Sequence, residues 1–291
     1  MPKVSVIIVN FNTVTVLRDC LLNLKDKYSN LEVIVVDNAS VDGSAALVES
    51  QFSWVKLIKN DKNYGLSVAS NKGLQMATGD YLLYMGTDAF PEQNTIEGMV
   101  SYMEKNPKVG IATCKLVMRD GNLDMDAHRG FPTLWTSITY FTKLSKIFPK
   151  SKLFNRYFQG WQNLDVPHEI DLCISHFMLI RRSVFKDLVS WNEEFFVFGE
   201  DVDLCYRAKR AGWKIMYLPQ WTALHYKGTG IGIRKTSSDI SPASEETKKR
   251  MMYERSRARK LFYEKYFLKG YPKVLVRLVT FSIDVLAKLK K

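Results

Sequence analysis

The chain has 291 residues, 46% of them hydrophobic and 25% charged, so it can bury a sizeable core and has the composition of a folded protein. This length excludes a small disulfide-stapled module, and the four scattered cysteines, which form no C-x-x-C pair, indicate buried thiols in a reducing compartment. The net charge of +12 is uneven, because residues 226–291 hold 17 Lys and Arg against 6 Asp and Glu, or +11, which leaves +1 for residues 1–225. An acidic partner is therefore expected for the C-terminal part only.

The N-terminal residues MPKVSVIIV lack the basic region and the cleavage site of a signal peptide, so we expect them to form a first strand. No window supplies the roughly 20 apolar residues of a membrane-spanning helix. The protein is therefore expected not to cross a bilayer.

Residues 4–114 alternate apolar, β-branched runs with helical patterns. Strands are predicted at 4–9, 31–36, 55–58, 81–85 and 109–114, and helices around 14–24, 44–51, 66–77 and 94–105. Strands that are apolar on both faces and separated by helices indicate a parallel sheet with both faces covered. We therefore predict an α/β, Rossmann-like fold with a mostly parallel central sheet and flanking helices.

The pattern becomes irregular between residues 116 and 170, where nine aromatic side chains are interleaved with Lys and Arg. We expect a lid or acceptor-side insertion here, with simple packing of the aromatics onto the body as the alternative. Further along, the sequence predicts a strand at 173–180 and a helix that begins near Glu200 and ends at Gly212. Two short strands, WKIMYLP and TALHY, are expected after it.

Polar side chains follow the predicted strands, where ligands of open α/β sheets bind. Asp37 is placed to accept hydrogen bonds from a nucleobase or ribose, although capping of the next turn with Ser40 explains it equally well. Asp88 could hold a divalent cation that bridges a diphosphate, although an isolated Asp at this position is as often a turn former. Neither a G-x-x-x-x-G-K-[ST] nor a G-x-G-x-x-G motif is present, which argues against P-loop and dinucleotide-binding proteins.

The densest acidic cluster, residues 200–203, follows an aromatic loop at the expected start of a helix. The helix dipole alone favours acids there, but an aromatic wall would raise a carboxylate's pKa and make it a general base, while Asp203 is expected to stabilise structure. His225 ends an apolar run and could join Asp88 as a ligand for Mn²⁺ or Mg²⁺, with a structural histidine as the alternative.

Several motifs in order carry a resemblance to a known family: VSVIIVNFN, VVDNASVDGS, NYGLSVASNKGLQMATGDYLLYMGTDAF, FMLIRRSVF, FFVFGEDVDLCYRAKRAGWKIMYLP and the late His225. Together they resemble family 2 glycosyltransferases with the GT-A fold, especially the rhamnosyltransferase-like branch, over roughly residues 3–265. The resemblance implies inverting transfer of a sugar, rhamnose or similar, from a nucleotide-diphosphate donor. The implied acceptor is a hydroxyl of a glycan or a lipid-linked molecule in surface polysaccharide biosynthesis.

The resemblance also implies roles for individual residues. In such enzymes the Asp of the VVDNAS-like motif binds the base, the Asp of the NPD-like motif holds the metal, and the acidic pair of the GED-like motif deprotonates the acceptor. The implied nucleotide-binding residues are Asn10, Phe11, Asp37, Asn38, Gly65 and Asn71. The implied metal ligands, for Mg²⁺ or Mn²⁺, are Asp88 and His225, and the implied catalytic residues are Glu200 and Asp201, with Asp201 favoured as the base.

Three segments depart from the pattern of this branch. Gly86-Thr87-Asp88 replaces Asn-Pro-Asp or Asp-x-Asp, which removes one side-chain acceptor from the expected metal site. Ser175-His176-Phe177 replaces Ser-Gly-Ala, and the residues SWNEE at 190–194 replace Gly-Gly-Phe-Asp-Glu. Because these segments flank the donor sugar or the acceptor, the identity of the sugar stays open.

The expected domains are a catalytic domain at 1–225, with a nucleotide-binding part at about 1–115 and an acceptor-side part at 116–225, and a basic helical extension at 226–291. Amphipathic helices predicted at 245–267 and 271–291 suit an anionic membrane and place the protein at the inner, cytoplasmic face of the cell membrane. Packing on the catalytic body, or on a second subunit in a homodimer, is the alternative. No nucleic-acid-binding motif accompanies the basic residues.

Two other functions compete with the glycosyltransferase interpretation. A nucleotidyltransferase should show a Gly-rich, basic signature after its first strand, and NFNTVTVL has neither property. A catalytically silent scaffold on the same fold would explain why residues 86–88 have one side-chain acceptor fewer than expected. The presence of both Glu200 and Asp201 argues against such a scaffold.

Overall fold

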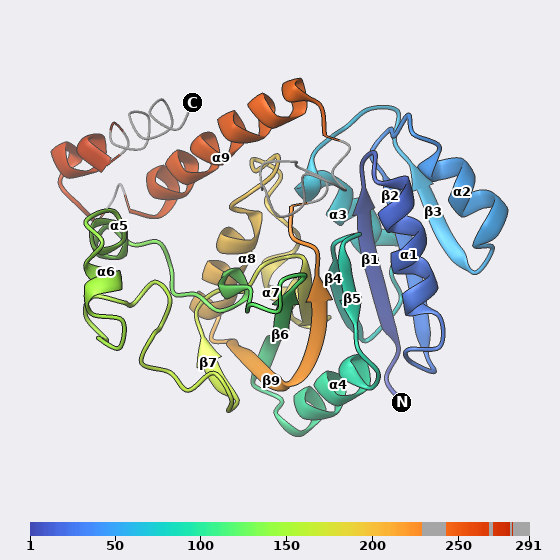
Figure 1. Ribbon diagram of the computed structural model, residues 1–291, viewed down its shortest axis with the longest axis horizontal. Coiled ribbons are helices and arrows are strands. Elements are labelled where there is room, and N and C mark those ends of the chain that lie inside the picture. The colour runs from blue at the N-terminus through green and yellow to red at the C-terminus, as the bar shows by residue number, and fades with distance from the viewer. Residues whose placement is uncertain (229–242, 268–269, 280, 282–291) are drawn as a thin grey trace.

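The computed structural model describes residues 1–228, 243–267, 270–279 and 281 (Figure 1). Nine strands form one sheet: β1 (Val4–Asn10), β2 (Leu31–Asp37), β3 (Val55–Lys59), β4 (Tyr81–Met85), β5 (Ala89–Pro91), β6 (Val109–Met118), β7 (His168–Ile170), β8 (Phe177–Arg181) and β9 (Lys214–His225). The helices around it are α1 (Val14–Leu24), α2 (Ser44–Gln51), α3 (Leu66–Met76), α4 (Thr95–Lys105), α7 (Val184–Leu188) and α8 (Glu200–Arg210). The expected α/β fold is confirmed, with the predicted elements of residues 4–114 within a few residues of their observed ends.

The strand order is β3-β2-β1-β4-β8-β6-β9-β5, with β7 on β9. The first four strands are parallel, as predicted, whereas β8 runs antiparallel to both β4 and β6. The chain order reverses between β1 and β4, so a crevice opens at their carboxyl ends. Thr13 and Thr87 face each other across this crevice, with their hydroxyl oxygens 3.1 Å apart.

Side chains on the two faces of the sheet form two separate cores. Val4, Val6 and Ile8 of β1 pack on one face with α1, α2 and α4, and Ile7 packs on the other face with α3, α7 and α8. Gly73 explains why α3 can lie so close to β1, because a Cβ at this position would lie 2.5 Å from a methyl carbon of Ile7. All four cysteines are free and buried, as predicted.

Several elements differ from the sequence prediction. The segments WKIMYLP and TALHY belong to one strand, β9, which continues through Pro219 because residues 219–221 form an irregularity between its pairs with Cys114 and Lys115 of β6. Short strands β5 and β7 were not predicted, and both depend on pairing with β9. The irregular aromatic segment contains α5 (Leu134–Phe141), α6 (Leu144–Ile147) and the 3₁₀ turn η1 (Met125–Ala127).

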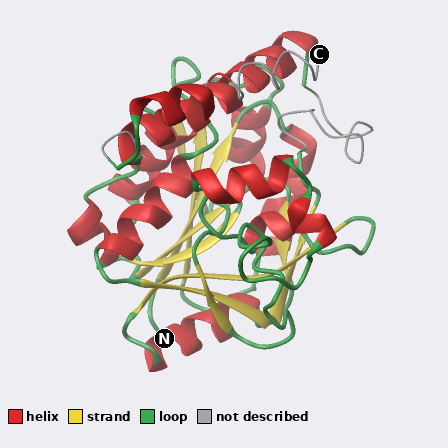
Figure 2. Ribbon diagram, turned by 90° about the vertical axis from the view of Figure 1, so that its left-hand side faces the viewer, coloured by secondary structure: helices red, strands yellow, loops and turns green. Residues whose placement is uncertain are grey.

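The basic helix α9 (Glu245–Tyr266) confirms the helix predicted at 245–267, but it packs on the catalytic body. Ala258 and Phe262 bury against Phe195 and the α8 residue Tyr206, and Tyr263 packs against Leu134 of α5. Its buried apolar face is therefore not available to a membrane, which corrects that expectation for this helix. Figure 2 views the molecule from the side that carries α5 and α6, with helices in front of the strands.

The second predicted C-terminal helix is described only in part. Residues 273–279 are helical, with Val276 buried and Val274, Leu275 and Leu278 exposed, whereas Leu286 and Leu289 lie outside the described residues. Within the described part of the chain, no helix is both long and apolar enough to cross a membrane.

Candidate active site

A cavity of about 680 Å³ lies at the carboxyl end of the parallel strands. Its walls come from the ends of β1 and β4, the start of α3, the segments before β8 and α8, and helices α5 and α9. Its lining includes Phe11, Asn38 and Gly65 from the first half of the sheet, the polar residues Asp88, His225 and Asp201, and Tyr140 and Phe262 from α5 and α9. The cavity thus joins most of the residues that the sequence singled out.

Asn10 and Asp37 hold the turn after β2. Asn10 donates to Asp37 Oδ1 at 2.7 Å, and the Ser40 amide donates to Asp37 Oδ2 at 2.9 Å. Both predicted nucleotide-binding residues are buried and lie behind the cavity wall. The turn-capping contact that competed with the ligand role for Asp37 is therefore present.

Phe11, Asn38 and Gly65 line the cavity, and Asn71 does not. Asn38 donates to the Gly65 carbonyl at 3.1 Å, whereas Asn71 exchanges hydrogen bonds with the backbone of Trp191. Gly65 has a φ of +85°, and a Cβ there would collide with Phe196. The start of α3 is thereby fastened to the loop that precedes Glu200.

Asp88, His176 and His225 form a cluster whose potential ligand atoms lie within 4.8 Å of one another. His225 Nδ1 donates to the buried Asp124 Oδ2 at 2.8 Å, which leaves Nε2 directed toward Asp88 Oδ1, 3.6 Å away. A carboxylate that orients a histidine in this way is typical of metal sites. The sequence predicted two members of the cluster, and His176 and the orienting Asp124 were missed.

The cluster fits a divalent cation on two observations. His225 Nε2 is buried and finds no hydrogen-bond partner among the described residues. Burial alone would lower the pKa of His225, but the carboxylates of Asp88 and Asp124 raise it to about 9. The position therefore attracts positive charge, which a proton or a metal ion can supply.

Two of the sequence departures are complementary in space. Gly86 stands where the resemblance leads us to expect Asn, and a Cβ on Gly86 would lie 2.8 Å from His176 Cδ2. His176 in turn stands where the resemblance leads us to expect Gly. The side chain lost at 86 thus leaves the space that the imidazole of His176 fills.

Glu200 and Asp201 line the cavity at the start of α8, and both are buried. Ser175 donates to Glu200 Oε1 at 3.1 Å, while Glu200 Oε2 finds no partner among the described residues. Asp201 Oδ2 lies 3.4 Å from a guanidinium nitrogen of Arg129. Burial raises the pKa of both carboxyl groups, and for Asp201 the Arg129 charge opposes this effect.

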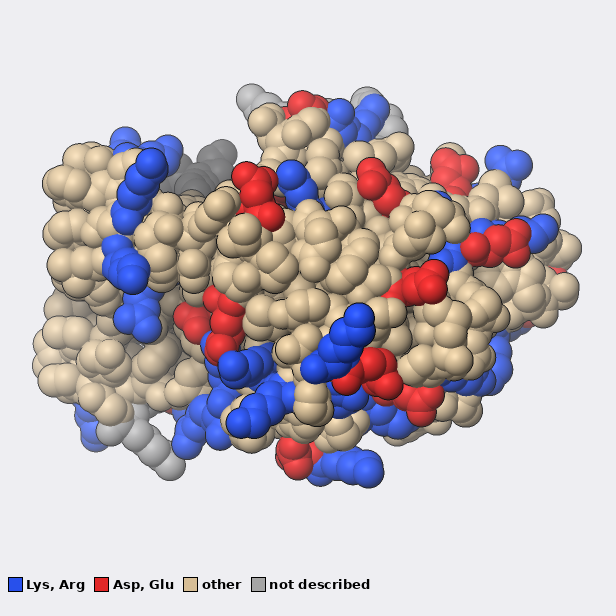
Figure 3. Space-filling model, turned by 90° about the horizontal axis from the view of Figure 1, so that it is seen from below, with Lys and Arg blue, Asp and Glu red and all other residues tan. Residues whose placement is uncertain are grey.

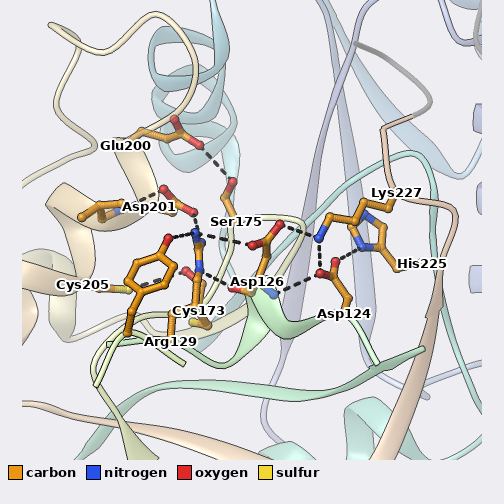
Figure 4. Close-up of polar contacts among 12 residues, drawn as sticks. Asp124, Asp126, Arg129, Cys173, Ser175, Glu200, Asp201, Cys205, His225 and Lys227 are labelled. Atoms are coloured by element: carbon orange, nitrogen blue, oxygen red, sulfur yellow. Dashed lines mark hydrogen bonds and ion pairs between the residues drawn. The ribbon is translucent and has the colours of Figure 1, made fainter. Parts of the chain in front are cut away.

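Arg129 and Lys227 place positive charge next to the acidic residues of the site (Figure 4). Arg129 also contacts Tyr157 at 3.2 Å and Asp126 at 3.8 Å, and Lys227 pairs with Asp124 and Asp126. These cations were not predicted, because they lie in segments without helix or strand periodicity. Asp203 faces away from the cavity and pairs with Arg207 at 2.7 Å, as expected for a structural residue.

A comparison with protein families matches residues 5–189 to a model described as glycosyl transferase family 2. A curated N-acetylglucosaminyl-diphospho-decaprenol L-rhamnosyltransferase of Mycobacterium tuberculosis is 25% identical over 230 residues, which cover 75% of this chain and 73% of that protein. The rhamnosyltransferase WbbL of Escherichia coli is 27% identical over 153 residues, 52% of this chain and 53% of that protein.

Two solved structures share the fold. The mannosyltransferase PcManGT of Pyrobaculum calidifontis, in complex with GDP-Man and Mn²⁺, aligns with a TM-score of 0.61 at 18% identity, covering 96% of this chain and 69% of that chain. TarS 1–349 of S. aureus, in complex with UDP-GlcNAc, aligns with a TM-score of 0.56 at 16% identity, covering 97% and 71%. The GT-A fold expected from the resemblance is thereby confirmed.

Replacement of Glu200 by Gln should stabilise the protein at alkaline pH. Burial raises the pKa of the Glu200 carboxyl in the folded state, so as pH rises the unfolded chain loses this proton before the folded protein does. The free energy of unfolding therefore decreases as pH rises above the ordinary pKa of a glutamic acid. We expect Glu200→Gln to raise the Tm by about 2 °C or more at pH 8 and by much less at pH 4. Thermal unfolding measured over a series of pH values tests this, with Glu92→Gln, a substitution of an exposed acid, as the control. If Glu200→Gln had a Tm at pH 8 equal to or lower than that of the unmodified protein, the raised pKa of Glu200 would be contradicted.

Proposed function

The chain belongs to glycosyl transferase family 2, and on this premise we propose that it is an inverting, metal-dependent enzyme that transfers rhamnose or a similar sugar from a nucleotide-diphosphate donor. The acceptor is a hydroxyl of a glycan or lipid-linked molecule in surface polysaccharide biosynthesis. The observation that carries the proposal is the single cavity shared by the Asp88 cluster and the Glu200–Asp201 pair. The rhamnosyltransferases among the relatives support the donor sugar.

The donor occupies the end of the cavity at β1, β2 and α3. Phe11, Asn38 and Gly65 contact the nucleotide, and Asn10 and Asp37 act from behind the cavity wall by holding the turn beside it. Asn71 acts indirectly, since it fixes the backbone at Trp191.

Asp88, His176 and His225 would hold Mg²⁺ or Mn²⁺ next to the donor diphosphate. When bound, such an ion supplies positive charge that stabilises the departing diphosphate. Asp124 keeps the Nδ1 proton of His225 in place, so that the lone pair of Nε2 faces the cluster. The complex of PcManGT with Mn²⁺ supports a cation at this kind of site.

Asp201 is the general base that removes the proton of the acceptor hydroxyl while the acceptor oxygen attacks the anomeric carbon opposite the diphosphate. A base must be ionised before the reaction, and Arg129 at 3.4 Å favours the ionised form of Asp201. Glu200, which lacks a cation at this distance in the described structure, remains protonated and can donate a hydrogen bond to a bound hydroxyl. One displacement of this type inverts the anomeric centre.

We also propose that residues 1–225 form the catalytic domain, with the donor held by about 1–115 and the acceptor by 116–225, and that residues 226–291 extend it. In this arrangement α9 serves as a wall of the acceptor end, where Arg255 and Arg259 line the cavity. The enzyme works at the inner face of the cell membrane as a peripheral protein, as a monomer or a homodimer.

Asp201→Asn should keep donor binding and abolish transfer, because the amide cannot accept the acceptor proton. The expected loss in kcat is at least about a hundredfold, the usual contribution of a general base. Release of the nucleoside diphosphate from a panel of nucleotide sugars, with acceptor present, measures kcat, and calorimetry measures donor binding. Glu194→Gln, an exposed acid in the preceding loop, is the matched control. If Asp201→Asn retained turnover, the assignment of Asp201 as the general base would be wrong. If the unmodified protein transferred no sugar from any donor, a catalytically silent scaffold would be favoured.

Arg129→Gln should move the acidic limb of the kcat/KM profile to higher pH. Loss of the guanidinium raises the pKa of Asp201, so protonation of the base begins at a higher pH. Arg129→Lys keeps the charge and should restore most of the original profile. An unchanged limb in the Gln variant, with the fold intact, would show that Arg129 does not set the protonation of the base.

A further inference from the structure

The insertion that contains α5 and α6 exposes large apolar side chains in a strongly basic setting. Between residues 127 and 164 there is no Asp or Glu, while Lys143, Lys146, Lys150, Lys152 and Arg156 are exposed. The exposed apolar side chains of the insertion include Trp135, Ile138, Phe141, Ile147, Phe148 and Leu153. Figure 3 shows blue side chains spread over a tan surface at the left-hand end of the molecule, the end that α5 and α6 occupy in Figure 1.

The C-terminal segment adds a second part to the same surface. Val279 packs against the cluster formed by Leu134 of α5 and Tyr263 of α9, which places the helical residues 273–279 beside the insertion. Val274, Leu278 and Phe281 are exposed there, and the described residues 270–279 hold Lys273 and Arg277 without any acid. Both parts therefore present apolar groups together with positive charge.

We propose that the exposed surface of residues 135–153, 271–279 and 281 docks on an anionic phospholipid bilayer. Exposed aromatic and aliphatic side chains flanked by lysines suit the boundary between head groups and acyl chains, where apolar burial and attraction to anionic lipids add. A protein partner would have to match each of these exposed lysines and arginines with an acid or leave it in solvent, whereas an anionic head-group layer matches them without a fixed geometry. The surface is thus explained by its charge as well as its apolar groups.

The position of the surface relative to the cavity gives it a function. Tyr140 and Phe141 line the acceptor end of the cavity and are also exposed, so the mouth of the cavity lies within the docking surface. Phe158, Phe262 and Val279 add apolar side chains to the wall there, beside Arg255 and Arg259. The sugar end of a lipid-linked acceptor could enter the cavity while its lipid stays in the bilayer. This step rests on the proposed function, whereas docking on the bilayer does not.

The test is partition of the full chain into vesicles of phosphatidylcholine with and without an equal part of phosphatidylglycerol. Ile147 is 64% and Leu153 59% exposed, and neither lines the cavity, so Ile147→Glu/Leu153→Glu alters the surface and spares the site. We expect at least about tenfold weaker partition into the anionic vesicles. Leu22→Glu on α1, 52% exposed and remote from α5 and α6 in Figure 1, is the matched control and should bind like the unmodified chain.

A second variant, Lys146→Gln/Lys150→Gln, tests the charge without adding apolar-to-acid changes. It should remove much of the preference for anionic over neutral vesicles, and high salt should act in the same direction. The proposal would be overturned if both double variants bound the vesicles as the unmodified chain does. It would also be overturned if the double variants still bound vesicles but light scattering showed that they had lost a dimer formed by the unmodified chain, because a second copy of the chain would then cover this surface. Donor binding, measured separately, must stay unchanged in these variants. If neither the unmodified chain nor any variant bound a donor, the proposed function would be contradicted, whereas the docking proposal would not be affected.

Discussion

The site depends on the balance of charge around four buried carboxyl groups, those of Asp88, Asp124, Glu200 and Asp201. Carboxylates are costly to bury without compensation, so each must be paired, protonated or joined to a cation. Asp124 has Lys227 and His225, Asp201 has Arg129, and burial favours the protonated form of Glu200. Asp88 faces the two histidines of the cluster. Within one cavity, this distribution separates the cluster proposed for a cation from the carboxylate proposed as the base, which is the arrangement that a single displacement on a sugar diphosphate requires.

Gly86 and His176 show how departures from a family pattern are understood only in three dimensions. Taken separately, the glycine removes an expected acceptor and the histidine is an unexpected bulky residue. The structure relates them, because the space above Gly86 is filled by His176, whose imidazole lies in the same cluster as Asp88 and His225. The candidate metal site, which the sequence led us to expect with one acceptor fewer, therefore has a third potential ligand in His176.

The sequence predicted the parallel strands and helices of residues 4–114 because their apolar residues repeat with the period of each element. It did not predict the continuous β9, because Pro219 suggests a break that the irregular pairing with β6 absorbs. Arg129 and Asp124 were beyond a sequence prediction, since they lie in turns whose position depends on β6 and on the contact with Leu172. The burial of α9 was weighed as an alternative, but only the aromatic partners Phe195 and Tyr206 identify the body as its contact.

The most direct test of the central claim is a thermal-shift measurement with nucleoside diphosphates and nucleotide sugars, each with Mn²⁺, with Mg²⁺ and with a chelator. A ligand that binds the folded state raises the Tm by mass action, and no acceptor is needed. If Asp88, His176 and His225 hold a cation beside the donor, nucleotides of one nucleobase should raise the Tm only when metal is present. Asp88→Asn should abolish this rise in Tm, and His176→Gly should reduce it. Stabilisation that persists in chelator, or that is the same in His176→Gly, would contradict the account.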